Sequence, residues 1–247
     1  MMRRHKDREE VHQRRESRRP SRQQRHQEPR MGSRGRPEES RAAILQAAAH
    51  EFAAHGLDGA RTDSIAREAR VNKALLYYYF KDKETLYGEV LNTVFEGLKK
   101  AISKALESNL PPREKVLAYA GAHFDYVAAN PMYPRLMQRE MMRAPYHSAY
   151  LEKVVRNYLI PTFHRVSELL AEGIAKGEFR KVDPAQFVPS MVAVIVFYFT
   201  GASMMQKISG INPLMPERIA ERRAAVLDFI SAALFAPKQT ATQGARS

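Results

Sequence analysis

From Pro37 onward, the apolar residues of this 247-residue chain recur at helical spacing. No stretch alternates apolar and polar residues as a half-buried strand does. In the first expected helix, residues 38–55, the side chains of Ile44, Ala48 and Phe52 share one face. Glycine and proline residues then divide the chain into about nine helical segments. The sequence therefore predicts an all-α fold.

The first 37 residues have a different composition. Arg, Gln, Glu, Ser and Pro dominate, so the segment cannot bury enough apolar surface to offset the entropy of ordering. It holds 13 Lys and Arg against 5 Asp and Glu, which is about +8 of the formal charge of +13. We predict a disordered basic extension over residues 1–37. Three interpretations of this segment are open. It adds nonspecific attraction for phosphates, it has no role, or it is not translated because translation starts at Met31.

Composition and motifs narrow the function classes. The chain has no Cys, which excludes disulfides, thiolate metal sites and Cys nucleophiles. The eight His residues lack metal-ligand spacing, and Gly-x-Ser-x-Gly and Gly-rich phosphate loops are missing, so we expect no enzyme and no cofactor. The basic N-terminus has no apolar signal segment, which fits a cytoplasmic protein. A net charge of +13 favours a polyanionic partner, either nucleic acid or an anionic membrane surface.

The second and third expected helices are short and closely spaced. Thr62 is the expected N-cap of the second helix. A tight turn at residues 70–72 leads to the third helix, residues 73–80, with Asn72 as its expected N-cap, and Asp82 caps a long fourth helix. Three helices with a tight turn between the last two form a helix-turn-helix, which places its final helix in the major groove of DNA.

The third helix carries a run of tyrosines, Tyr77 to Tyr79. Successive residues lie about 100° apart on a helix, so one face cannot bury all of them. A phenol can hydrogen-bond a phosphate and pack its ring on a sugar or a thymine methyl group. Lys83, in the first turn of the next helix, can meet a phosphate together with free backbone N–H groups. Taken singly, such tyrosines are more often partly buried core residues than DNA contacts, and Lys73 and Lys83 are more often ordinary surface residues.

Together these residues form one spaced pattern. It reads Ile44-Leu45, Ala48, Phe52, Gly56, Thr62, Ile65-Ala66, Ala69, Val71, Leu76-Tyr77-Tyr78-Tyr79-Phe80, Lys83-Glu84 and Leu86. The pattern resembles the DNA-binding signature of the TetR/AcrR family of transcriptional regulators. The resemblance implies a homodimer that binds a near-palindromic double-stranded DNA operator. It also implies a helical remainder that senses a small-molecule effector of unknown identity.

Within the family pattern these residues have implied roles at the DNA. Thr62 would contact a phosphate at the start of the second helix, and Lys83 would contact another. The remaining candidates lie on the third helix: Lys73 and Ala74 at base edges, Tyr77 at a base or phosphate, Tyr78 at an aromatic position that often contacts DNA, and Tyr79 at a phosphate.

The chain departs from the family pattern at two positions. The family usually has Gly in the turn where Arg70 stands, and a left-handed backbone there would cost roughly 1 kcal/mol. The family often has His where Tyr79 stands, and a phosphate contact by Tyr79 is still expected.

The resemblance divides the chain into a DNA-binding domain at 38–85, an effector and dimer domain at 86–236, and a disordered tail at 237–247. Helices near 113–129, 132–143 and 148–176 would enclose a pocket. Its candidate lining residues are His123, Tyr126, Arg135, Met137, Arg139, Met141, Phe163 and Phe187, each of which is otherwise ordinary core or surface.

Two features of this domain have open alternatives. Arg135 and Arg139 lie four residues apart and can hold an anionic ligand, or pair with an acid such as Glu140. Residues 185–206 carry no formal charge and are long enough to span a bilayer, but polar residues dilute them. A helix that is hydrophobic all round can also form the centre of a dimer. The resemblance favours a dimer interface at helices 185–207 and 216–235, so we expect no membrane partner.

We therefore expect a ligand-responsive repressor that releases its operator when the effector binds. The alternative is an architectural DNA-binding protein that uses the basic extension and senses nothing. Such a protein would show little sequence preference and a steep dependence on salt. The large helical body argues against it, because DNA binding alone does not need one.

Overall fold

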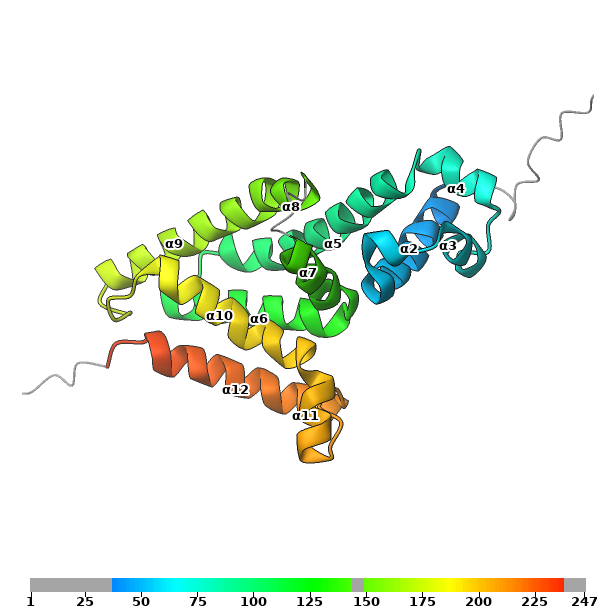
Figure 1. Ribbon diagram of the computed structural model, residues 1–247. Helices are drawn as coiled ribbons and strands as arrows, with labels where there is room; N and C mark the ends of the chain where they lie inside the picture. Colours follow the sequence, from blue (N-terminus) through cyan, green and yellow to red (C-terminus); the bar gives the residue numbers. More distant parts are fainter. Residues whose placement is uncertain (1–36, 144–148, 238–247) are drawn as a thin grey trace, which may run out of the picture. The chain divides into compact units, whose positions relative to one another are not determined.

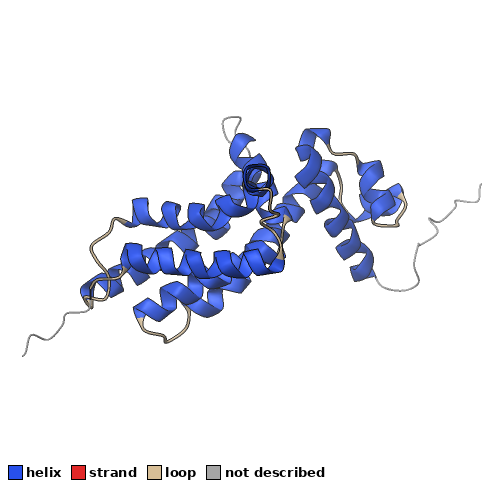
Figure 2. Ribbon diagram, turned by 90° about the horizontal axis from the view of Figure 1, so that it is seen from below, coloured by secondary structure: helices blue, strands red, loops and turns tan. Residues whose placement is uncertain are grey.

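The computed structural model describes residues 37–143 and 149–237, which form helices and no sheet (Figure 2). The all-α prediction is thereby confirmed. The expected basic extension before Pro37 and the expected tail after Pro237 lie outside the described residues.

The N-terminal part consists of α2 (Pro37–Gly59), α3 (Thr62–Glu68), α4 (Lys73–Tyr79) and the long α5 (Lys83–Leu106) (Figure 1). The helical spacing of apolar residues predicted which face of α2 is buried, since its apolar stripe packs onto α3, α4 and α5. Fully buried side chains join these helices into one core: Ile44, Phe52, Ile65, Leu76, Phe80 and Leu86.

Local signals set most of the helix ends. The Asn72 side chain accepts a hydrogen bond from the Leu75 backbone N–H at 2.7 Å, as an N-cap does. The Asp82 side chain accepts one from the Thr85 backbone N–H at 2.6 Å. Gly56 has the expected positive φ of 70°, but its ψ of −179° is extended, so it forms a kink inside α2, which continues to Gly59.

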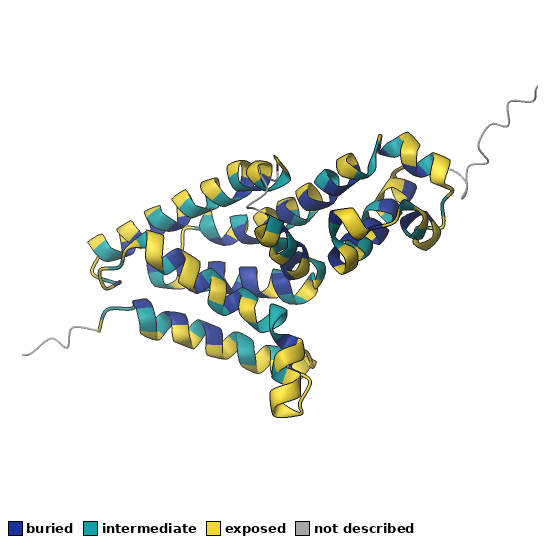
Figure 3. Cartoon of the chain, in the orientation of Figure 1, coloured by how far each residue is buried: buried dark blue, intermediate teal, exposed yellow. Residues whose placement is uncertain are grey.

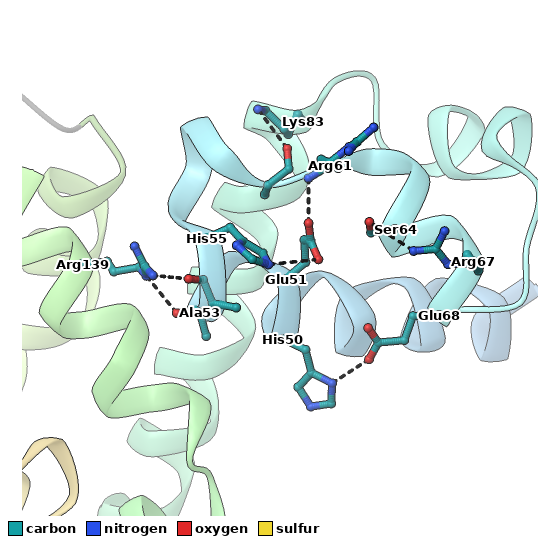
Figure 4. Close-up of polar contacts among 12 residues, drawn as sticks. His50, Glu51, Ala53, His55, Arg61, Ser64, Arg67, Glu68, Lys83 and Arg139 are labelled. Carbon is teal, nitrogen blue, oxygen red and sulfur yellow. Dashed lines mark hydrogen bonds and ion pairs between the residues drawn. The ribbon is translucent and has the colours of Figure 1, made fainter. Parts of the chain in front are cut away.

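The predicted N-cap at Thr62 is wrong. Arg61 occupies the cap position with an extended backbone, φ −114° and ψ 119°, and Thr62 is the first helical residue. No side chain caps α3 from this position. Instead the carboxylate of Glu51, from α2, accepts a hydrogen bond from the Arg61 backbone N–H at 2.9 Å (Figure 4). A contact between two helices therefore replaces the local cap.

The body is built around α6 (Pro112–Ala129), which packs against α5, α9, α10 and α12. After α7 (Met132–Arg143), one helical stretch comprises α8 (Ala149–Val154), the π-helix η2 (Val155–Leu159) and α9 (Ile160–Ala175). This stretch matches the predicted helix at 148–176, with a π segment that periodicity alone does not indicate.

The C-terminal helices are α10 (Pro184–Thr200), α11 (Ala202–Ser209) and α12 (Pro216–Leu234). The predicted continuous helix at 185–207 breaks at Gly201, a poor helix former, and bends by 64°. No single helix in the described ranges is long and apolar enough to cross a bilayer, and α10 and α11 reach that length only as a bent pair. Figure 3 shows α11 as the most exposed helix of the body.

Candidate DNA-binding helix and effector cavity

The turn between α3 and α4 depends on a left-handed arginine. Arg70 has φ 56°, a conformation that costs an L-residue other than glycine roughly 1 kcal/mol. The Val71 backbone N–H donates to the Ala66 carbonyl at 2.9 Å and closes the end of α3. Arg70 stands where the family usually has Gly, and it adopts the positive φ that Gly would adopt. The turn therefore keeps its backbone path without a glycine.

Helix α4 separates its tyrosines between the core and solvent. Leu76 is fully buried and Tyr79 is half-buried, whereas Tyr77 is 41% and Tyr78 80% exposed. This split follows from the 100° step between successive residues. Lys73 and Ala74 are also exposed, so they share the outer surface of α4 with Tyr77 and Tyr78.

Helix α3 contacts this outer surface through two polar pairs. The hydroxyl oxygens of Thr62 and Tyr77 lie 3.4 Å apart. The Lys73 ammonium lies 2.9 Å from an Asp63 carboxylate oxygen, and this hydrogen-bonded ion pair lowers the pKa of Asp63 and raises that of Lys73. Both partners of the ion pair are exposed, so water and salt screen it and an acceptor atom at a base edge can replace Asp63 as the partner of Lys73.

Lys83 has a structural contact in addition to its predicted role. Its ammonium donates to the backbone carbonyl oxygens of Asp58 and Ala60, each at 3.3 Å, and Figure 4 draws one of these two hydrogen bonds. The Asp58 carbonyl lies in the last turn of α2 and the Ala60 carbonyl in the link to α3, so Lys83 stabilises this connection. A contact between Lys83 and a DNA phosphate stays a prediction.

The body contains a cavity of about 740 Å³. Of the eight predicted lining residues, His123, Met137, Met141 and Phe163 lie on its wall. Helices α5, α6, α7, η2, α9 and α10 supply the other lining residues: Phe95, Leu98, Lys99, Ile102, Tyr119, Tyr133, Pro134, Gln138, Met142, Tyr158, Leu159, Thr162, Val188, Pro189, Val192, Ala193, Val196, Phe197 and Thr200.

The other four predicted residues lie elsewhere. The Tyr126 hydroxyl donates to the Val94 carbonyl at 2.5 Å, and Arg135 is exposed on α7. Phe187 lines a second, smaller cavity of about 430 Å³ between α10 and α12. Arg139 contacts α2, so it and Arg135 do not meet at one anion site.

Sequence reasoning missed the aromatic wall of the cavity and the contribution of α10. Tyr119 precedes His123 by one helical turn, which is a spacing that could have indicated it. Tyr133 and Tyr158 reach the wall from other helices, and no local signal marks them. Apart from Phe187, which lies elsewhere, the residues of the uncharged α10 are predicted only for a dimer interface, whereas Val192 and Val196 line the cavity.

His123 is the buried polar group of this wall. Its side chain is 3% exposed, and neither ring nitrogen has a hydrogen-bond partner among the described residues. The rings of Tyr119 and Tyr133 flank it at centroid distances of 6.0 and 6.3 Å. Burial lowers the pKa of His123 to about 4, so the imidazole is neutral at pH 7.

Helix α7 contacts both the cavity and the N-terminal helices. The Arg139 guanidinium donates from Nε to the Ala53 carbonyl at 2.8 Å and from a second nitrogen to the Ala54 carbonyl (Figure 4). These carbonyls lie in the last turn of α2 before Gly56, where helix carbonyls lack partners in their own helix. The next residue, Glu140, is 1% exposed and accepts a hydrogen bond from the Tyr87 hydroxyl at 2.5 Å.

Comparison with known proteins gives a consistent result. Residues 44–90 match the family model "Bacterial regulatory proteins, tetR family", and residues 112–230 match "Tetracyclin repressor-like, C-terminal domain". The HTH-type transcriptional repressor SCO4008 of Streptomyces coelicolor is 40% identical over 106 residues, which cover 43% of this chain and 52% of that protein. The HTH-type transcriptional regulator RutR of Escherichia coli is 27% identical over 168 residues, 68% of this chain and 77% of its own length.

Among solved structures, a linker mutant of HlyIIR has 27% sequence identity to this chain and a TM-score of 0.65. The match covers 83% of this chain and 100% of that one. HlyIIR itself is described as a hemolysin II transcriptional regulator. The matched segment spans only about half of SCO4008.

Proposed function

Because this chain belongs to the TetR family of transcriptional regulators, we propose that it is a sequence-specific repressor that releases its operator when a small molecule occupies the cavity. The observation that carries the proposal is the outer surface of α4, where Lys73, Ala74, Tyr77 and Tyr78 are exposed directly after a helix-turn-helix turn. Such a helix fits the major groove, where base edges are read.

The proposed DNA contacts combine positioning and base recognition. Thr62 and Tyr77 have adjacent hydroxyls and both are suited to a phosphate. Lys73 and Ala74, at the start of α4, are suited to base edges. Tyr78, Tyr79 and Lys83 complete the proposed set, with Tyr78 the most exposed of them.

Two copies are proposed to pair through α10 and α12, which would present two α4 helices to successive major grooves. The exposed residues Ala185, Gln186 and Ser190 of α10, which do not line the large cavity, carry no charge. An exposed helix face without charge is typical of a surface that another protein covers. The DNA-binding domain would then comprise residues 38–85, and the effector and dimer domain residues 86–236.

Helix α7 is the proposed route from effector to DNA. Met137 and Met141 line the cavity, whereas Arg139, on the same helix, holds the carbonyls at the end of α2. A ligand that displaces α7 therefore changes the support of α2 and, with it, the position of α4. The ligand would favour the conformation that does not fit DNA and shift the population toward it.

Selection from a random-sequence duplex library at about 0.15 M salt tests the DNA-binding part with the full-length protein. We expect enrichment of an inverted repeat, because a symmetric dimer binds two half-sites. Equal retention of all sequences, with binding that falls steeply as salt rises, would instead indicate an architectural DNA-binding protein.

Substitution of Tyr77 by Phe is expected to weaken binding to the selected operator about 3- to 10-fold, since one hydrogen bond to phosphate is lost. The melting temperature is expected to stay unchanged, because the hydroxyl is exposed and its 3.4 Å contact with Thr62 is long. Fluorescence anisotropy and thermal unfolding measure the two quantities. Wild-type operator affinity in Tyr77→Phe would remove this hydroxyl from the proposed contacts.

Substitution of Arg139 by Met is expected to loosen the end of α2. The two lost hydrogen bonds predict hydrogen exchange about 5- to 150-fold faster for the amides of residues 50–56. Arg135→Met is the matched control, because Arg135 is exposed on the same helix. Mass spectrometry of exchanged peptides measures the rates. Equal rates in the two variants would argue against Arg139 as the link.

A further inference from the structure

The cavity wall contains very little charge. Of the described residues that line it, Lys99 alone is charged at pH 7, and its side chain is exposed. The Lys99 ammonium lies 3.8 Å from Glu96 and 5.9 Å from the centre of the Tyr158 ring. The inner wall is therefore apolar and aromatic, with a basic residue at an exposed position.

Two tyrosine hydroxyls on this side of the body, those of Tyr158 and Tyr126, already have partners. The Tyr158 hydroxyl donates to the Asn92 side chain at 2.5 Å, so the tyrosine presents its ring to the cavity. The π segment η2 carries Tyr158 and Leu159, which both line the cavity. Tyr126, beside the wall, donates to the Val94 carbonyl.

His123 differs from these groups, because both of its ring nitrogens lack a partner among the described residues. A buried polar atom without a hydrogen bond is costly, and native proteins rarely contain one. The neutral imidazole offers one N–H donor and one lone pair. His123 lines the cavity, but both ring nitrogens are buried, so a bound molecule supplies the missing hydrogen bond after a small rotation of the imidazole toward the cavity.

We propose that this cavity binds an uncharged, largely apolar molecule with a hydroxyl group, which forms a hydrogen bond with a ring nitrogen of His123. This inference rests on the proposed function, since it names the effector class for the same cavity. A volume of about 740 Å³ suits a drug-sized molecule. The rings of Tyr119 and Tyr133 flank His123 and give the apolar part of such a molecule aromatic surface to pack on.

Charged ligands fit this wall less well. A buried ammonium would find no carboxylate among the described lining residues. A carboxylate at the depth of His123 would meet a neutral imidazole, while Lys99 is exposed. A buried charge without a partner is far more costly than a buried hydroxyl that is hydrogen-bonded. A hydroxyl can donate to one imidazole nitrogen or accept from the other, whichever tautomer is present.

A matched ligand series tests the inference: 4-hexylphenol, hexylbenzene, 4-hexylbenzoic acid and 4-hexylbenzylamine, which share one apolar frame. Isothermal titration of the full-length protein at pH 7 gives each affinity. We expect the phenol to bind about tenfold tighter than hexylbenzene, because it supplies the missing hydrogen bond. The acid and the amine are expected to bind more weakly than the phenol. Tighter binding of the acid, or equal binding of phenol and hexylbenzene, would overturn the inference.

His123→Phe removes both nitrogens and keeps a flat ring between Tyr119 and Tyr133. In this variant we expect phenol and hexylbenzene to bind within about twofold of each other. His123→Leu repeats the test with a different side chain, so the result does not depend on the folding of one variant. His164→Phe, an exposed histidine on α9, is the control and should keep the tenfold preference. A preference for phenol that persists in both His123 variants would overturn the inference.

Operator binding is measured separately in the presence of each ligand. If the phenol binds through His123 but operator affinity does not change, the ligand class stands and the proposed switch fails. If the acid or the amine releases the operator and the phenol does not, the proposed regulator stands and the hydroxyl assignment fails.

Discussion

Substitution of Phe229 by Glu is expected to separate the proposed dimer into monomers and to weaken operator binding by about 10²- to 10⁴-fold. Phe229 lies on α12 and is 57% exposed, which is a large apolar surface to leave in water. If a second copy covers it, a carboxylate at this position buries an unpaired charge in the interface. A monomer then binds only one half-site of the operator. It loses the affinity that a dimer gains by binding both half-sites at once.

The neighbours of Phe229 support this choice. One turn earlier and one turn later on the same face, Ala225 and Ala232 are exposed, and small residues let another helix approach closely. Phe229 also lines the second cavity, between α10 and α12, together with Phe187 and Ser190. The surface is therefore hollowed and partly apolar where the two expected interface helices meet.

Sedimentation equilibrium gives the mass of Phe229→Glu, and fluorescence anisotropy gives its operator affinity. Ala171→Glu is the matched control, since it adds the same charge to an exposed position on α9, outside the proposed interface. The control is expected to remain dimeric. A Phe229→Glu protein with the mass of a dimer and wild-type affinity would contradict an interface through α12.

Acidification is expected to destabilise the protein through His123. Burial lowers the pKa of this imidazole to about 4, from the ordinary value of 6.5 that the unfolded chain retains. Between pH 6.5 and about 4 the unfolded state therefore binds a proton that the folded state does not. The free energy of unfolding falls as the pH decreases through this window, by about 3 kcal/mol from this residue. Above pH 6.5 its contribution is constant.

Urea unfolding at pH 7 and at pH 4.5 measures this effect. Carboxylates titrate in the same window, so the comparison is between wild type and His123→Phe, in which those groups are retained. We expect the variant to gain about 2–3 kcal/mol relative to wild type on going from pH 7 to pH 4.5. His164→Phe, at an exposed histidine, is expected to follow wild type. The same stability difference at both pH values would show that His123 is not buried in its neutral form.

Much of the N-terminal helical architecture could be predicted because its signals are local. Asn72 and Asp82 cap the helices that follow them, and Gly56 interrupts the first helix with the expected positive φ. Each of these features depends on a few consecutive residues and on backbone geometry that is the same in any protein. The predicted N-cap at Thr62 was wrong because Arg61, the cap residue of α3, is held by Glu51, ten residues earlier on another helix.

The cavity could be predicted only in part. Its helices were found, and His123, Met137, Met141 and Phe163 line it. Arg139 could not be placed from the sequence, because its guanidinium contacts Ala53 and Ala54 at a separation of 85 to 86 residues. The same holds for Lys83, whose partners are carbonyls 23 and 25 residues earlier.

The sequence by itself determined the helical fold, the position of the helix-turn-helix and most helix ends, because periodicity, caps and glycine conformation act within a few residues. Only the tertiary structure decided which side chains meet across helices. It set Arg139 against α2, brought Tyr133 and Tyr158 to the cavity, and left His123 buried without a partner among the described residues. These contacts depend on how whole helices pack, and a helix constrains the direction of its side chains without specifying the neighbour they reach.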